Sequence, residues 1–328
     1  MNFSTLDNWT AKKTGLGDAL TPSALAHWHH QALRRQAQYA IANSPFWRDL
    51  YADADLDAPQ TWPLISERTL QDAGNSMLCL PQSRVLRVIS MATSGSTGKP
   101  KRVYFSAADI DLTVAFFAHG LTTFTLPKER IFICMNQNST DSLGNLLTRA
   151  AQRTDMQPLL YGDITDYEDA LKAAEEFNPN CIAGHPQQIL RLAEHSPTLR
   201  PRTVLLSADT LPEELRLRVS DLWRTEVFDH WGMRETGLGG ALECRFHEGY
   251  HIRHADIYLE IIDPQTGEIL PDGENGELVL STLNREAMPL LRYRTGDITR
   301  LIHTECLCGS KLKRLGQIQR TSYKQHNS

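Results

Sequence analysis

Residues 85–101, VLRVISMATSGSTGKPK, decide the fold, because a short apolar strand pattern leads directly into a loop of hydroxyl-bearing residues and glycines. Glycines permit close approach of the backbone to a ligand, and N–H and O–H groups can donate to an anion. The pattern predicts a polyphosphate-binding loop; alone, it is also compatible with a surface turn. The loop residues are Thr93, Ser94, Gly95, Ser96, Thr97, Gly98 and Lys99.

Two better-known phosphate loops do not match this stretch. The P-loop pattern requires Ser or Thr after its lysine, whereas Pro100 follows Lys99 here. The glycine fingerprint of dinucleotide-binding folds is also absent from it. A P-loop NTPase is therefore a remote alternative.

Strand and helix patterns alternate after the loop. Strands are predicted over residues 103–105, 131–135, 181–184, 203–206 and 226–229. Helices are predicted from residue 106 and over residues 143–151, 170–177, 186–194 and 211–222. Such alternation predicts a mostly parallel sheet with helices on both faces. Before the loop, Thr21 and Pro22 form a helix-start signal, and the helix is expected to reach residue 42.

The pattern changes after about residue 240. Strands over residues 258–262 and 277–281 are joined by the turn-rich segment DPQTGEILPDGENG. Strands over residues 292–294 and 299–302 follow, with Thr295-Gly296-Asp297 predicted as a turn between them. We expect an α/β fold with nucleotide- and acid-binding subdomains over residues 1–240 and a small antiparallel β subdomain over residues 241–328.

Composition excludes several classes of protein. The 328 residues carry a formal net charge of −5, which disfavours a nucleic-acid-binding surface. The N-terminal segment lacks the apolar core of a signal peptide, and no run approaches the ~18 apolar residues that span a bilayer. We therefore expect a soluble cytoplasmic protein of two or three structural units.

Several motifs together resemble one superfamily. The stretch MATSGSTGKPKRV resembles the phosphate loop of adenylate-forming enzymes, which include acyl-CoA synthetases, peptide-synthetase adenylation domains and luciferases. Residues 231–236, WGMRET, and 293–297, YRTGD, resemble two further motifs of that superfamily, in the same order. The segments NSPFWRDLYADADLD and CLCGSKLKRLGQIQR are similar to the phenylacetate–CoA ligase branch. The resemblance covers about residues 6–320 and implies the N-terminal domain fold of these enzymes.

The resemblance also implies roles for individual residues. The loop with Lys99 would hold the β- and γ-phosphates of ATP, Asp297 would accept hydrogen bonds from the ribose, and Glu235 would ligate Mg²⁺. The remaining nucleotide-binding candidates are Ser207, Ala208, Asp209, Trp231, Gly232 and Arg320, the last preceded by Gln319 in place of the family's glycine. The alternatives are an ordinary turn for Asp297, an exposed helix start for Glu235 and plain core for Trp231.

The sequence departs from the family at two places. Arg234 replaces the usual Thr or Ser, so we expect either a permanent charge near the phosphates, with a catalytic role, or a salt bridge to a neighbouring acid. The sequence also stops at Ser328, so we expect the family's mobile C-terminal domain and its catalytic lysine to be absent. Three alternatives remain open: a separate protein supplies that function, adenylation is slow, or only binding is retained.

Cys244, His251, Cys306 and Cys308 are predicted to bind one Zn²⁺, because thiolates and an imidazole suit a closed structural zinc site. Phenylacetate–CoA ligase-like proteins resemble this chain here too. The site would tether the β subdomain to the catalytic one. His247 and His254 are possible substitutes for His251, and three reduced cysteines with an unrelated histidine are the alternative.

The predicted function is ATP-dependent activation of a small carboxylic acid as acyl-AMP, and an aromatic acid is one candidate. In a second step the acyl group would be transferred to CoA or another acceptor. The alternative is a nucleotide- or acyl-adenylate-binding protein without efficient turnover, acting with a partner. Phe116, Phe117, Asn136 and Gln137 are candidates for the acid pocket, or else ordinary core and loop residues. A homodimer is compatible with the sequence.

Overall fold

The chain folds into two units that interleave along the sequence. A computed structural model describes residues 6–91, 100–196, 198–207 and 211–320. The first unit comprises Met1–Trp9, Asp111–Met233 and Leu238–Tyr250, and the second comprises Thr10–Ile110, Arg234–Gly237 and His251–Ser328. Each of these units combines segments that are distant in sequence, and the subdomain boundary at residue 240 stays a prediction.

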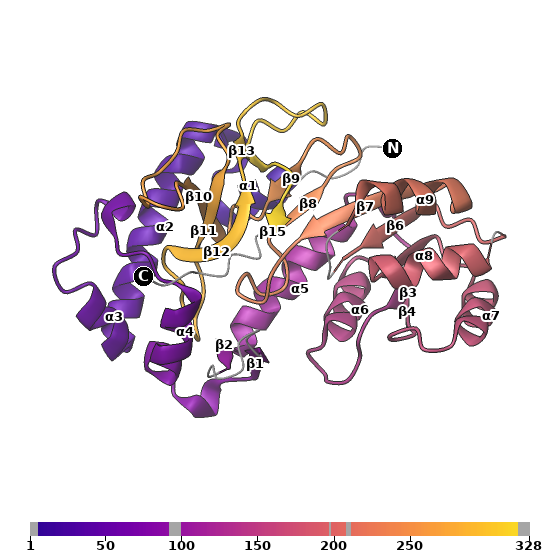
Figure 1. Cartoon of the computed structure of the whole chain (residues 1–328), viewed down its shortest axis with the longest axis horizontal. Helices are drawn as coiled ribbons and strands as arrows, with labels where there is room; N and C mark the ends of the chain where they lie inside the picture. Colours follow the sequence, from indigo (N-terminus) through magenta and orange to yellow (C-terminus); the bar gives the residue numbers. More distant parts are fainter. Residues whose placement is uncertain (1–5, 92–99, 197, 208–210, 321–328) are drawn as a thin grey trace. The chain divides into compact units, whose positions relative to one another are not determined.

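The first unit is built on a largely parallel sheet with strand order β4–β3–β5–β6–β7–β8 (Figure 1). The first five are mutually parallel, and β8 pairs antiparallel with β7. This confirms the α/β fold predicted from the alternating pattern. The strands are β3 (Arg130–Cys134), β4 (Gln157–Leu160), β5 (Cys181–Gly184), β6 (Thr203–Leu206), β7 (Glu226–Trp231) and β8 (Ala241–Glu243).

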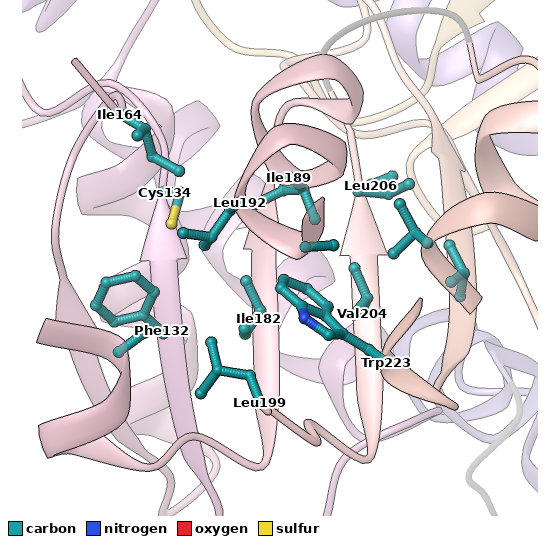
Figure 2. Close-up of a cluster of buried hydrophobic side chains, with 14 of the residues drawn as sticks. Phe132, Cys134, Ile164, Ile182, Ile189, Leu192, Leu199, Val204, Leu206 and Trp223 are labelled. Atoms are coloured by element: carbon teal, nitrogen blue, oxygen red, sulfur yellow. The ribbon is translucent and has the colours of Figure 1, made fainter. Parts of the chain in front are cut away.

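Helices supply the apolar layers of this unit. They are α5 (Ala107–Leu121), which begins in the second unit, α6 (Leu143–Arg153), α7 (Tyr167–Phe177), α8 (Pro186–His195) and α9 (Glu213–Trp223). Figure 2 shows the core beneath α7–α9, where Trp223 and Ile189 lie against Ile182 and Val204 of the central strands. These strands are buried on both faces, which explains their continuous apolar runs.

The second unit contains the remaining helices and a smaller antiparallel sheet with strand order β10–β11–β12–β15. The predicted antiparallel β subdomain is thereby confirmed. Its helices are α2 (Pro22–Asn43), α3 (Pro45–Leu50) and α4 (Glu67–Ala73), and α1 (Leu6–Thr14) enters it from the first unit. Its strands are β1 (Arg87–Met91), β2 (Lys101–Phe105), β9 (Tyr250–Ile252, beginning at the unit boundary), β10 (Ile257–Ile262), β11 (Gly276–Thr282), β12 (Tyr293–Thr299), β13 (Leu301–Ile302), β14 (Arg314–Leu315) and β15 (Gln319–Arg320).

The predicted turn at residues 295–297 is wrong, because β12 continues through it as a bulged strand. Glu277 of β11 pairs with Ile298, whereas Val279 pairs with Arg294, so β12 advances four residues while β11 advances two. Gly296 has φ of 78°, a conformation that favours glycine. The turn chemistry therefore produces a β-bulge within the sheet and not a reversal of the chain.

Candidate active site

Trp231 ends β7 in the first unit, and two glycines make room around it. A Cβ at Gly240 would lie 2.3 Å from the indole ring, and one at Gly232 would lie 2.5 Å from the Leu238 carbonyl oxygen. Both distances are too short for any side chain. Packing therefore requires the glycine of the Trp-Gly motif, and the buried indole ring of Trp231 packs directly against Gly240. Its role beside the adenine stays a prediction.

The first unit also contains an apolar cavity of about 390 Å³, its opening to solvent included. Phe116 and Phe117 contribute to its wall, as predicted for the acid pocket, together with Leu147 and Leu242. Asn136 and Gln137 are not among its lining residues; the neighbouring Met135 is. Its polar side chains are Ser207 and His230, whose Oγ and Nδ1 atoms lie 3.1 Å apart.

Glu235 lies in the second unit, at the centre of a buried polar cluster. Its Oε1 lies 2.6 Å from Lys101 Nζ and accepts a hydrogen bond of 3.1 Å from the Tyr293 hydroxyl. The Lys101 and Glu235 side chains are only 10% and 2% exposed, which excludes an exposed helix-start role for Glu235. Burial, followed by the charges of Glu235 and Glu67, raises the pKa of Tyr293 well above its ordinary value, so the hydroxyl remains a donor.

The main chain at Glu235 is fixed by a second set of buried contacts. Arg285 Nη2 donates to the Glu235 carbonyl oxygen at 3.0 Å. The two residues after Arg285 are fixed in turn. The Asp109 carboxylate accepts hydrogen bonds from the N–H groups of Glu286 and Ala287 at 2.7 and 3.0 Å, and these bonds help to position Arg285. Glu235 is therefore fixed through both its side chain and its main chain, which preorganises its carboxylate.

Arg234 is exposed, and it forms no ion pair with any residue in the part of the chain that the structure describes. The predicted salt bridge to a neighbouring acid is thus not present there. Asp297 is buried within the β12 bulge, where its N–H donates to Thr295 Oγ1 at 3.1 Å and its main chain pairs with Arg320 of β15. Asp297 and Arg320, two of the predicted nucleotide ligands, therefore lie on paired strands.

His251, Cys306 and Cys308 come together in the second unit, with their ligand atoms within 4.8 Å of one another. The 3.5 Å between His251 Nε2 and Cys308 Sγ equals the separation expected for ligands of one tetrahedral Zn²⁺, given bonds of ~2.0 and ~2.3 Å. Gly309, with φ of 90°, turns the backbone after the sulfurs. The donor set and its spacing therefore fit zinc.

His251 interacts with two of the cysteine sulfurs of this cluster. Burial opposes protonation of His251, but hydrogen bonds to the sulfurs of Cys306 and Cys308 outweigh it and raise the His251 pKa to about 9. The two proposed substitute histidines are engaged elsewhere: His254 Nε2 lies 2.9 Å from the Lys313 carbonyl oxygen, and His247 Nδ1 lies 3.1 Å from Glu243 Oε2. Cys244 follows β8 in the first unit, and its participation stays a prediction.

Some predicted ligands lie outside the described residues: Thr93, Ser94, Gly95, Ser96, Thr97, Gly98, Lys99, Ala208 and Asp209. Conversely, Lys101, Tyr293 and His230 were not predicted as site residues. Tyr293 begins the quoted YRTGD motif, and Lys101 is two residues beyond Lys99, so both were within the motifs but had no visible partner. Among the described residues, no helix is both long and apolar enough to span a bilayer.

The chain thus combines an α/β unit whose strand β7 runs into the Trp-Gly motif with a buried glutamate–lysine pair and a bulged YRTGD strand. The model of the AMP-binding enzyme family matches residues 87–284, and the chain belongs to that family. It is 30% identical over 323 residues to phenylacetate–coenzyme A ligase of Thermus thermophilus, covering 92% of this chain and 71% of that protein. The corresponding ligase of Pseudomonas putida is 29% identical over 299 residues, covering 85% and 67% of the two chains.

Solved structures agree on the fold. The structure of 2-hydroxyisobutyryl-CoA ligase with 2-HIB-AMP and CoA, in its thioesterification state, matches with a TM-score of 0.79 at 22% identity. The match covers 94% of this chain and 69% of that one. The fold is therefore that of the N-terminal part of adenylate-forming CoA ligases. The chain spans roughly two thirds to seven tenths of the length of these three proteins.

Proposed function

We propose that the protein is an acid–CoA ligase that activates a carboxylic acid with ATP. A carboxylate oxygen of the acid attacks the α-phosphorus in line, the bond to the bridging oxygen breaks, and pyrophosphate leaves, giving acyl-AMP. The CoA sulfur then attacks the acyl carbonyl and AMP leaves. The observation that carries this proposal is the buried Lys101–Glu235–Tyr293 cluster inside the motifs of an AMP-binding family member.

Glu235 fits the role of a Mg²⁺ ligand in part. A hard cation takes carboxylate oxygens, commonly one or two from the protein with the rest from phosphates and water. Because Oε1 is already engaged by Lys101 and Tyr293, the cation would need the other oxygen or the displacement of Lys101. Mg²⁺, when bound, supplies charge neutralisation at the phosphates. Lys101 supplies a positive charge at the same carboxylate and holds it in place.

The other candidate residues receive matching roles. Asp297 would accept from the ribose hydroxyls, Trp231 would lie beside the adenine with Ser207, Ala208, Asp209 and Gly232, and the loop of residues 93–99 would bind the phosphates. Arg320 would reach the nucleotide from β15. The apolar cavity suits an acid with an apolar body, such as an aromatic one, because apolar walls offer a charged or strongly polar body no compensation for lost hydration.

The zinc proposal is structural. His251, Cys306 and Cys308 would hold Zn²⁺ with Cys244 as fourth ligand, closing the coordination shell as structural sites do. Such thiolate ligands persist in a reducing compartment, so we place the reaction in the cytoplasm. The expected role is to hold the loop before β14 in one conformation.

The deciding experiment is ATP–pyrophosphate exchange with a panel of carboxylic acids, run beside ATP binding by calorimetry. Exchange that depends on an acid supports the ligase. A second candidate, nucleotide or acyl-adenylate binding without efficient turnover, is favoured by Arg234, which takes the place of a hydroxyl residue and is exposed. Tight ATP binding without exchange for any acid would establish that candidate. Restored exchange in Arg234→Thr would assign the loss to this residue.

A further inference from the structure

His230 has an unusual place in the cavity of the first unit. The walls are otherwise apolar apart from Ser207, which is the usual lining of a site for a small apolar molecule with a few polar groups. His230 Nε2 is buried and has no hydrogen-bond partner among the residues that the structure describes. An unpaired buried polar atom is costly and needs an explanation. A ligand that fills the cavity is the simplest source of the missing partner.

The hydrogen bond to Ser207 determines which kind of partner is missing. Ser207 Oγ and His230 Nδ1 lie 3.1 Å apart, and Ser207 is buried. If Nδ1–H donated to Oγ, the buried serine hydroxyl would itself be left without an acceptor. If the hydroxyl donates to Nδ1 instead, both atoms are satisfied and the ring proton is on Nε2. The second arrangement leaves one unpaired group, an Nε2–H donor.

The imidazole is also neutral and fixed in place. Burial lowers the pKa of His230 to about 4, so the ring carries one proton near neutral pH. The Phe117 ring lies edge-on to it with centroids 6.2 Å apart, and a Cβ at Gly232 would come within 2.9 Å of His230 Cε1. A fixed, neutral donor in an apolar wall distinguishes ligands that carry a hydrogen-bond acceptor from ligands that do not, and it adds no charge to the cavity.

We propose that His230 is a specificity-determining residue that donates from Nε2 to an acceptor atom on the body of the acid substrate. The substrate class is then an apolar ring-bearing acid with one hydrogen-bond acceptor, such as a ring nitrogen or an ether or carbonyl oxygen. The inference rests on the proposed function, since it deepens the identity of the acid that the enzyme activates.

The test compares phenylacetate with the three pyridylacetate isomers in acid-dependent pyrophosphate release. A ring nitrogen loses hydration on entering an apolar cavity, so a cavity without a donor disfavours every isomer. We expect at least one isomer to exceed phenylacetate about tenfold or more in kcat/KM, because phenylacetate leaves the buried donor unpaired. The preference should disappear in His230→Leu and survive in His230→Gln, which keeps an amide donor.

Leu242→Met is the matched control, because it changes the same cavity wall without adding or removing a strong donor. It should alter phenylacetate and pyridylacetate alike and keep their ratio. A fall by one common factor for all acids in His230→Leu would overturn the inference, since His230 would then act on the shared carboxylate or on ATP. Activity with phenylacetate and no preference for any isomer would also overturn it, while leaving the ligase function intact.

One measurement is independent of both the acid and the variants. Nitrogen-15 spectra of histidine-labelled wild-type protein distinguish the two neutral tautomers. The Nε2–H tautomer for His230 is expected, and Ser207→Ala should redistribute the proton between the ring nitrogens. An Nδ1–H tautomer in the wild type would overturn the proposed donor. Absence of pyrophosphate release with every acid would instead contradict the proposed function.

Discussion

Replacing Lys101 with methionine tests the buried cluster around Glu235 most directly. Methionine keeps an unbranched side chain of similar length but removes the ammonium group, which lies 2.6 Å from Glu235 Oε1 and 3.4 Å from the Tyr293 hydroxyl. Lys101 also lies 3.3 Å from Glu67, but that carboxylate is 54% exposed, so this second pair contributes little to stability.

The expected cost follows from burial. Removing one partner of a buried ion pair leaves an uncompensated charge and costs about 3–5 kcal/mol. Tyr293 still donates to Glu235 in the variant, so the lower end, about 3 kcal/mol, is expected. The measurement is the free energy of unfolding in urea at pH 7, with the slope checked for constancy. Arg102→Met is the matched control, because Arg102 is the next residue of β2 and is exposed, and it should change stability by no more than about 0.5 kcal/mol.

A double-mutant cycle with Glu235→Gln separates the pair from its surroundings. If the ammonium and carboxylate interact as the structure indicates, Lys101→Met should cost clearly less in the Glu235→Gln background, with a coupling energy of about 1–3 kcal/mol. Additive effects, or a single-variant loss below about 1 kcal/mol, would refute the argument that this pair is a buried and coupled unit. ATP–pyrophosphate exchange should fall in Lys101→Met and stay unchanged in Arg102→Met.

Three further predictions use other parts of the chain. Burial lowers the pKa of His29 to about 4, below the ~6.5 of the unfolded state, so the native state binds fewer protons and loses stability as pH falls from about 6.5 to 4. His29→Gln should remove roughly 3 kcal/mol of that loss in pH-dependent urea unfolding; parallel curves would contradict it. Purified protein should contain about one zinc per chain by metal analysis. Cys306→Ser should lower both the zinc content and Tm, whereas the control Cys79→Ser should keep the zinc. Less than about half an equivalent of zinc in the wild type would refute the site. Asp297→Asn should weaken ATP binding about tenfold or more by calorimetry with little change in Tm, since the main-chain pairing of β12 with β15 remains; unchanged affinity would refute the ribose role.

The elements best predicted from sequence are those with local signals. The strands at Cys181–Gly184 and Thr203–Leu206 have the predicted bounds, because continuous apolar runs between turn residues identify buried parallel strands. α2 begins at Pro22 after the predicted Thr21 cap, whose side chain accepts from the Ala24 N–H. β4 was missed, since its side chains are only partly buried and it contains Pro158 at the edge of the sheet.

The residues of the candidate site likewise divide into those that the sequence motifs predict and those that only the structure reveals. The motifs containing Glu235, Trp231 and Asp297 are visible in the sequence because each is a short contiguous segment. The turn predicted at Gly296 became a bulge, since the same positive φ serves either structure and only the pairing with β11 selects between them. Lys99 lies outside the described residues and stays a prediction for the phosphates, and the pairing of Lys101 with Glu235 was not visible in the sequence.

The sequence by itself thus determined the family, the alternating α/β layout and the segments predicted to bind nucleotide, because these depend on local periodicity and contiguous motifs. Only the tertiary structure decided which charges pair and which polar atoms stay unpaired. Lys101 meets Glu235 across 134 positions of chain, and His230 lines an apolar cavity while its buried Nε2 has no partner among the described residues. Such contacts depend on strand order, burial and distance, and no local pattern of residues contains that information.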